Sequence, residues 1–343
     1  MNRNEEKTMN ARERLDAFYA GQPVDRLPNL TIVGSVVTRY TGIDLEQYCK
    51  DPIAMADAAI LAAKDLGLDY VQIASDLSRE AEGYGTELKY TKTGLPTVVK
   101  PALDDITDVD SLKTRHVRDI PRLQDIVDAT AYALKKEPEI YPMSAVVGPA
   151  TVAGNMRGVE DFMVDFFDEP ECVQKLLRIV TDTLLDSVRE LAKVGAKYIY
   201  VPDPVASLLS PAAYREFILP LHKELYAEMK KHGIGGRLHM CGNTGALIAN
   251  SSTCGAFIID VDHATDFPKA LDAAADRCWL NGNIDPVADV FDCSAPHTKE
   301  AILHCAELTK GRKAMYMPGC ELPTATPIEN VKAIAEALRE IGA

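Results

Sequence analysis

Short apolar runs alternate with longer amphipathic segments along most of the chain. Eight of these runs have the length and composition of buried strands, and the segments between them repeat apolar residues at helical spacing. The alternation is typical of an α/β protein with a parallel sheet. The predicted strands are Asn29–Gly34, Asp69–Ala74, Tyr141–Val147, Lys197–Val201, Gly236–Met240, Ala256–Val261, Cys278–Gly282 and Ala314–Met317.

The longest helix is predicted over Pro170–Val194, where apolar residues form one stripe, proline stands at the start and Gly195 follows the end. The segment from Asn10 to Ala20 predicts a helix before the first strand. Three further helices are expected where a capping residue precedes proline. These starts are Asp51–Pro52, Ser210–Pro211 and Thr326–Pro327.

Eight strands in alternation with helices favour a (β/α)8 TIM barrel, since no strand is followed by the GxGxxG turn of a dinucleotide-binding sheet. We expect one domain over residues 1–343, with an N-terminal helical extension at 1–28 and an insertion at 77–125 after the second strand. The stretch TELKYTKTGLPTVV in this insertion resembles a hairpin. Two smaller α/β domains are the alternative.

Charge and composition exclude several classes of partner. The chain has 37 Lys and Arg against 51 Asp and Glu, and this net charge of −14 disfavours nucleic acid and anionic lipid. No apolar window has the length of a membrane span, and the first residues, MNRNEEKTMN, lack the apolar stretch of a secretory signal. We therefore expect a cytoplasmic protein with no membrane partner, whose eight cysteines are reduced.

Three soft side chains follow predicted strands. His239 and Cys241 are two positions apart at the end of the fifth strand, so both point to one face, and Cys320 follows the eighth strand. In a barrel these strand ends open at the same mouth. One imidazole and two thiolates suit Zn²⁺ and leave a fourth position free, as catalytic zinc requires. The alternative is a core histidine beside two small apolar cysteines.

Polar residues also follow other strands. Asp203 stands between two prolines after the fourth strand. It is a candidate substrate contact, fourth zinc ligand or general base, and the alternative is capping of the helix near Ser210. Asp76, Asn243 and Asn283 are candidate substrate contacts.

An acidic cluster follows the sixth strand. Asp260, Asp262 and His263 are close in sequence, but alternation lets only part of the set face the mouth. We expect this cluster to orient His239 rather than to bind a second metal.

The segments LHMCGNT, NGNIDP, MPGCELPTATPIEN, VGPATVAG and GQPVDRLPN together resemble the uroporphyrinogen decarboxylase superfamily, from about Arg12 to Ile341. The His-x-Cys pair with a distant Cys resembles its zinc branch, the methylcobalamin:coenzyme M methyltransferases and related corrinoid-dependent enzymes. The resemblance implies a zinc at His239, Cys241 and Cys320 and a reaction in which a zinc-bound thiolate takes the methyl group of methylcobalamin. It also implies two partners, a small thiol or methylated small molecule and a separate corrinoid protein.

The decarboxylase branch of the superfamily matches less well. Its arginine-rich stretch MRQAGR, which binds propionates, corresponds here to GSVVTRYTG with only Arg39. Its C-terminal GHG corresponds to Gly319–Cys320–Glu321, whereas Asp76 stands where the decarboxylases place an Asp. A decarboxylase of a uroporphyrinogen-like acid and a non-catalytic zinc- or corrinoid-binding protein are the alternatives.

Overall fold

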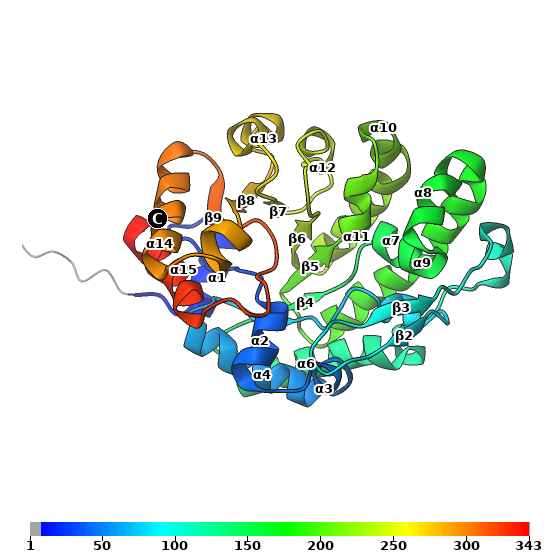
Figure 1. Cartoon of the computed structure of the whole chain (residues 1–343), viewed down its shortest axis with the longest axis horizontal. Coiled ribbons are helices and arrows are strands. Elements are labelled where there is room, and N and C mark those ends of the chain that lie inside the picture. Colours follow the sequence, from blue (N-terminus) through cyan, green and yellow to red (C-terminus); the bar gives the residue numbers. More distant parts are fainter. Residues whose placement is uncertain (1–7, 343) are drawn as a thin grey trace, which may run out of the picture.

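The computed structural model describes residues 8–342, so residues 1–7 of the expected 1–28 extension and residue 343 of the expected domain lie outside the described residues. Seven parallel strands form one curled sheet in the order β1-β4-β5-β6-β7-β8-β9, with helices arranged around its outside (Figure 1). This architecture is consistent with a TIM barrel. The strands are β1 Val71–Ile73, β4 Pro142–Ala145, β5 Tyr198–Pro202, β6 Gly235–His239, β7 Ile258–Val261, β8 Trp279–Ile284 and β9 Ala314–Pro318.

The helices follow the predicted caps closely. The long helix α9 spans Pro170–Lys193 with a continuous buried stripe, as predicted. The α4 helix begins at Pro52, where the Asp51 carboxylate accepts from two backbone N–H groups. The α15 helix begins at Ile328, one residue later than predicted, because Pro327 is its cap. The other α-helices are α1 Ala11–Tyr19, α2 Gly34–Thr41, α3 Leu45–Lys50, α5 Arg79–Glu82, α6 Pro121–Lys136, α7 Pro149–Arg157, α8 Val159–Asp168, α10 Pro211–Ala213, α11 Leu219–Lys231, α12 Ile248–Ser251, α13 Phe267–Ala274 and α14 Ala295–Leu308.

The strand predicted at Asn29–Gly34 is wrong, because the structure has buried, irregular chain at 29–33 and α2 begins at Gly34. Side chains accept hydrogen bonds from the backbone N–H groups that would otherwise pair with a neighbouring strand. The Asn29 N–H donates to Asp69 Oδ2 (2.6 Å), the Val33 N–H to Gln72 Oε1 of β1 (2.9 Å), and the Leu30 N–H to Met317 Sδ of β9 (2.9 Å). This segment therefore lies between β1 and β9 and takes the eighth position of the sheet.

Additional structure lies between β1 and β4. The predicted hairpin is present as antiparallel strands β2 Glu87–Lys89 and β3 Thr97–Lys100. Two 3₁₀ turns, Ile106–Ser111 and Val117–Asp119, follow it before α6. Since α6 begins at Pro121, the last residues of the expected insertion belong to an outer helix.

The N-terminal helix closes one end of the sheet. The Tyr19 ring of α1 lies 4.4 Å from the ring of Tyr198 and 4.4 Å from that of Phe257, centroid to centroid. The Phe18 ring is 4.9 Å from Trp279. These partners lie at or next to the first residues of β5, β7 and β8, so α1 covers the N-terminal ends of the strands and leaves their C-terminal ends for chemistry. Among residues 8–342, none of the helices has the length and apolar character needed to cross a membrane.

Candidate metal centre

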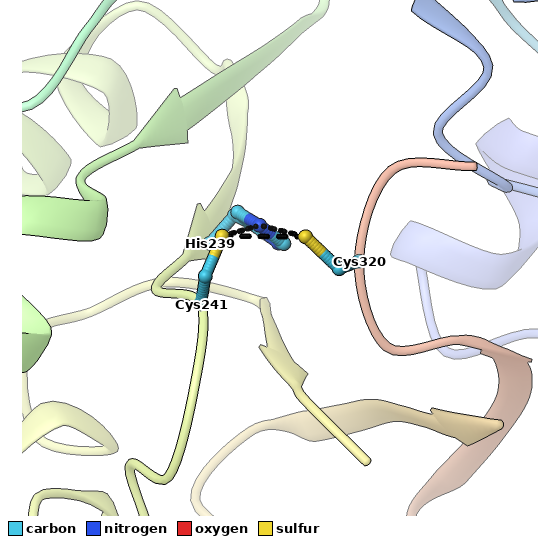
Figure 2. A group of neighbouring side chains, drawn as sticks. All are labelled: His239, Cys241 and Cys320. Atoms are coloured by element: carbon cyan, nitrogen blue, oxygen red, sulfur yellow. Dashed lines mark hydrogen bonds between the residues drawn. The ribbon is translucent and has the colours of Figure 1, made fainter. Parts of the chain in front are cut away.

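Two strand ends bring together the three predicted ligands. His239 is the last residue of β6, Cys241 lies on the loop after it, and Cys320 comes from the loop after β9 (Figure 2). His239 Nε2 is 2.9 Å from Cys241 Sγ and 3.6 Å from Cys320 Sγ, and the two sulfur atoms are 3.3 Å apart. In the described part of the chain, no other three His, Cys, Asp or Glu side chains lie close enough to share one metal ion.

The loops after β6 and β9 depend on glycine at two positions. Gly242 has φ +80°, which turns the chain directly after Cys241, and its N–H donates to Asp262 Oδ2 (2.9 Å). At Gly319, a Cβ would lie 2.6 Å from the backbone oxygen of Val261. Only glycine allows this close approach, which carries Cys320 toward the end of β7.

Asp260 fixes the orientation of the His239 ring. The two residues are paired in register on neighbouring strands β6 and β7, and His239 Nδ1 is 2.9 Å from Asp260 Oδ2. The other oxygen, Asp260 Oδ1, accepts from Asn281 Nδ2 (2.7 Å). Nε2 is therefore the nitrogen that faces the sulfur atoms. The expected orienting role falls to Asp260, because Asp262 accepts instead from the Gly242 N–H and lies 2.7 Å from His263 Nδ1.

The three groups shift one another's protonation. Burial lowers the pKa of His239, but Asp260 and Cys320 raise it more, to about 9. The hydrogen bond between the two thiol groups lowers the pKa of Cys320 to about 5 and raises the pKa of Cys241. A metal ion must displace protons from His239 and Cys241, so its binding should weaken as the pH falls.

A pocket of about 100 Å³ opens beside the three ligands. Asp76, one of the predicted substrate contacts, lines it and is buried. Its carboxylate forms an ion pair with Arg122 and accepts from the Ser78 N–H (2.9 Å). Leu95, from the loop of the β2–β3 hairpin, also lines the pocket, so this hairpin borders the metal centre.

Asp203 lies outside the group of three ligands. It is fully buried, and its Oδ1 accepts from both the N–H and the hydroxyl group of Thr151, each at 2.7 Å, at the start of α7. Its Oδ2 lies 2.9 Å from His222 Nε2. Capping of the helix near Ser210 by Asp203 is wrong, because Ser210 caps α10 itself. The catalytic roles considered for Asp203 stay predictions.

The two predicted asparagines lie elsewhere. Asn243 is exposed on the loop after Cys241, and its Oδ1 accepts from the Gly245 N–H (3.4 Å). Asn283 Nδ2 donates to the Thr265 carbonyl (2.8 Å), and this side chain lines a separate hollow of about 550 Å³ beside α14. Neither lines the pocket beside the metal ligands, and their roles in substrate binding stay predictions.

Sequence reasoning missed several residues of the pocket. Gln72 and Tyr200 line it from β1 and β5, and each is a polar side chain within an apolar strand, a signal that could have identified them. Arg79 and Leu95 line it from segments outside the strands, and so does Glu321, which follows Cys320 after a predicted strand. No local pattern distinguishes Arg79 and Leu95 from ordinary loop or helix residues.

Fold and site together are consistent with a TIM-barrel enzyme whose chemistry takes place at the C-terminal ends of the strands. Residues 10–341 match the family model described as uroporphyrinogen decarboxylase (URO-D), and the chain belongs to this family.

Similar sequences carry two kinds of name. The methylcobamide:CoM methyltransferase MtbA of Methanosarcina acetivorans is 26% identical over 335 residues, covering 96% of this chain and 97% of that protein. A methylated-thiol–coenzyme M methyltransferase of Methanosarcina mazei is 27% identical over 346 residues, covering 97% and 90%. A uroporphyrinogen decarboxylase of Coxiella burnetii is 24% identical over 335 residues, covering 93% and 92%.

Solved structures agree on the fold. A methyltransferase from Methanosarcina mazei superimposes with a TM-score of 0.87 at 23% identity, covering 97% of this chain and 99% of that chain. A B12-independent methionine synthase from Shewanella has a TM-score of 0.56 at 14% identity, with 83% and 86% covered. Both likenesses agree with a TIM-barrel-like fold for the chain.

Proposed function

We propose that the chain is a zinc-dependent methyltransferase that moves a methyl group between a corrinoid and a zinc-activated small thiol or other methyl partner. In this proposal methylcobalamin is the corrinoid and a separate protein carries it. The observation that carries the proposal is the convergence of His239, Cys241 and Cys320, with Asp260 holding Nε2 toward the sulfur atoms. The names of the methanogen relatives, methylcobamide:CoM and methylated-thiol–coenzyme M methyltransferase, support it.

The residues present fit Zn²⁺. Imidazole nitrogen and thiolate sulfur are its preferred donors, and three protein ligands would leave one coordination position for a substrate. When bound, Zn²⁺ would lower the pKa of a substrate thiol, so that the thiol would be held as a nucleophilic thiolate near neutral pH. Asp260 keeps the Nδ1 proton on a neutral imidazole, while Cys241 and Cys320 supply two negative charges that balance the ion. The residues of the pocket then position the substrate and exclude water.

A decarboxylase is the second reading, because one group of relatives carries that name. The pocket argues against it. Among the described residues, Arg79 is the one arginine that lines it, and its two Nη groups donate to the carbonyls of Asp76 (2.8 Å) and Ala145 (2.7 Å). Arg39 is exposed on α2. Several propionates would stay unpaired, each at a desolvation cost of several kcal/mol. We expect no coproporphyrinogen from uroporphyrinogen.

Metal analysis and a methyl-transfer assay test the proposal. We expect one zinc per chain, strongly weakened zinc binding in Cys241→Ala and Cys320→Ala, and unchanged binding in Cys172→Ala, a partly exposed cysteine on α9. With a panel of thiols, the visible spectrum of methylcobalamin should change to that of the demethylated corrinoid only when metal-loaded protein is present. Full activity after verified zinc removal would refute the proposal. Zinc binding without any methyl transfer would favour a non-catalytic binding protein.

The remaining details of the organisation are part of the same proposal. We place residues 1–343 in one TIM-barrel domain in which the segment 29–33 takes the place of an eighth strand. The N-terminal extension is at 1–28, and the insertion begins at 77 and ends before α6. We place the reaction in the cytoplasm, where free thiols stay reduced.

A further inference from the structure

A buried arginine lies next to the metal centre on the same strand. Arg237 precedes His239 by two residues on β6, so both side chains point to the same face of the sheet. Its side chain is 1% exposed. A buried guanidinium needs partners, because an unpaired charge inside a protein is strongly unfavourable. Its contacts therefore indicate why it is there.

Arg237 contacts two different parts of the chain. Its Nε lies 2.9 and 3.0 Å from the two oxygens of Asp260, and its Nη1 donates to the Leu30 carbonyl (2.7 Å). Its guanidinium carbon lies 5.3 Å from the ring centroid of Tyr200, which lines the pocket. The carboxylate that orients His239 is thus itself held by Arg237 and Asn281.

The hydrogen bond from Arg237 to Leu30 connects β6 to the segment 29–33. Leu30 belongs to the irregular segment 29–33, which lies between β1 and β9. β6 is the middle strand of the order β1-β4-β5-β6-β7-β8-β9, so it lies opposite this segment in a curled sheet. The Arg237 side chain therefore crosses the interior of the sheet to reach Leu30, and its Nε also contacts the Asp260 carboxylate. A simple counterion for Asp260 would not need the second contact.

We propose that Arg237 is a positioning residue of the metal centre. It holds the Asp260 carboxylate in place through the contact with Leu30, and so directs His239 Nε2 toward the cysteines. It also neutralises Asp260, so that the net charge at the metal is that of the three ligands alone. The proposal rests on the proposed zinc site for its catalytic meaning, but the orientation of His239 is a property of the metal-free chain as well.

The test uses Arg237→Met and Arg237→Lys, with Arg157→Met as the matched control. Arg157 is the last residue of α7, is largely shielded from solvent and is also paired with two carboxylates, Asp161 and Asp165. In metal-free protein labelled with ¹⁵N-histidine, the His239 Nδ1 proton should give a low-field signal, assigned by its absence in His239→Gln. We expect this signal in the wild type and in Arg157→Met, and its loss in Arg237→Met.

Zinc affinity, measured by competition with a chelator, gives the second readout. It should fall about 10- to 100-fold in Arg237→Met, as for other residues that orient metal ligands, and stay unchanged in Arg157→Met. The thiolate-to-cobalt band of Co²⁺-loaded Arg237→Met should shift as well. Arg237→Lys should recover part of the affinity, because an ammonium group can neutralise Asp260 but lacks the fork that also reaches Leu30.

Each outcome decides the proposal. Folded Arg237→Met with the wild-type signal and affinity would overturn it. If Arg237→Met does not fold, Arg237→Lys decides, and wild-type values in that variant would overturn it too. A wild type that binds no zinc would refute the proposed function instead, while the metal-free histidine signal would still test Arg237.

Discussion

The two ring nitrogens of His239 have different partners, and this difference defines the centre. Nδ1 lies 2.9 Å from Asp260 and Nε2 lies 2.9 Å from Cys241. A histidine whose Nδ1 proton is held by a carboxylate presents its Nε2 lone pair in one direction and is a stronger ligand. The carboxylate in turn depends on Arg237 and Asn281. The three candidate metal ligands are thus connected, through His239, to a buried polar network of Asp260, Arg237 and Asn281.

At the residue scale we predict that Asp203→Asn destabilises the fold without emptying the metal site. The carboxylate accepts from Thr151 at the start of α7 and lies 2.9 Å from His222, and the amide nitrogen of asparagine would face one of these donors. Loss of a buried charged acceptor should lower the free energy of unfolding by about 1–3 kcal/mol.

Urea unfolding and metal analysis of the same preparation check this prediction. Zinc stoichiometry should match that of the wild type. Folded Asp203→Asn that has lost its zinc would instead make Asp203 a metal ligand, and unchanged stability would contradict the structural role.

Local spacing was enough to predict that His239 and Cys241 share one face, but not which residues hold them in place. His239 and Cys241 lie two positions apart on a strand end, and period-two geometry alone brings them to one face. Arg237 obeys the same alternation, yet its role depends on Leu30, about two hundred residues away in sequence and across the sheet. Such a contact leaves no local pattern, so nothing in the sequence around Arg237 indicates its role.

At the element scale, the β2–β3 hairpin shapes the pocket through Leu95. We predict that Leu95→Ala raises the KM for the methyl acceptor about fivefold, since removing roughly 1 kcal/mol of apolar contact has this effect. Zinc content should not change. Val99→Ala is the control, because Val99 lies on the same hairpin, is 57% exposed and does not line the pocket. Equal KM values for the two variants would exclude the hairpin from substrate binding.

Two outer helices are joined by a pH-sensitive link. Hydrogen bonds from Lys231 and from Arg189 of α9 lower the pKa of Glu228 on α11 to about 2. The usual pKa of 4.5 applies in the unfolded chain, so the contribution to stability is complete above pH 4.5 and is lost as the pH falls toward 2. The partners are exposed, which limits the contribution to about 1 kcal/mol.

Glu228→Gln should therefore lower stability at pH 7 and leave a shallower loss between pH 4.5 and 2. Urea midpoints measured across this range check the slope. In 1 M salt the difference between wild type and variant should shrink, because salt screens exposed charges. Identical pH profiles at low salt would contradict the link.

Elements with capping residues were predicted well, and the error at 29–34 has a physical cause. The apolar run in this segment correctly predicts that its residues are buried, and Leu30 and Val33 are buried in the structure. Whether a buried run forms a ladder depends on its neighbours. Here Asp69, Gln72 and Asn29 itself accept the backbone N–H groups, and Asn29 Oδ1 is 3.2 Å from the Thr31 nitrogen. Sequence patterns carry no information about that competition.

At the scale of the whole molecule, closure of the sheet is linked to the metal centre. The segment 29–33 seals the seam between β1 and β9, and its Leu30 carbonyl receives the arginine that supports His239. Cys320 follows β9 at the same seam, and the Leu322 N–H donates to the Ile32 carbonyl (3.1 Å). A disturbance of the seam should therefore reach two of the three ligands.

Asp69 holds the segment 29–33 in place at this seam. Its buried carboxylate pairs with Arg14 and Arg26, each at 2.6 Å, and accepts from the Asn29 N–H at 2.6 Å. Asp69→Asn removes the charge that two guanidinium groups share, and the loss of one partner from a buried ion pair lowers stability by about 3–5 kcal/mol. Asp272→Asn, at an exposed pair with Arg312, should change it by less than about 1 kcal/mol. Urea unfolding measures both variants.

Below the unfolding transition, chelator competition should show weaker zinc binding in Asp69→Asn but not in Asp272→Asn, because loosening the seam shifts both Leu30 and Cys320. Wild-type zinc affinity in a destabilised Asp69→Asn would mean that the seam and the metal centre are independent.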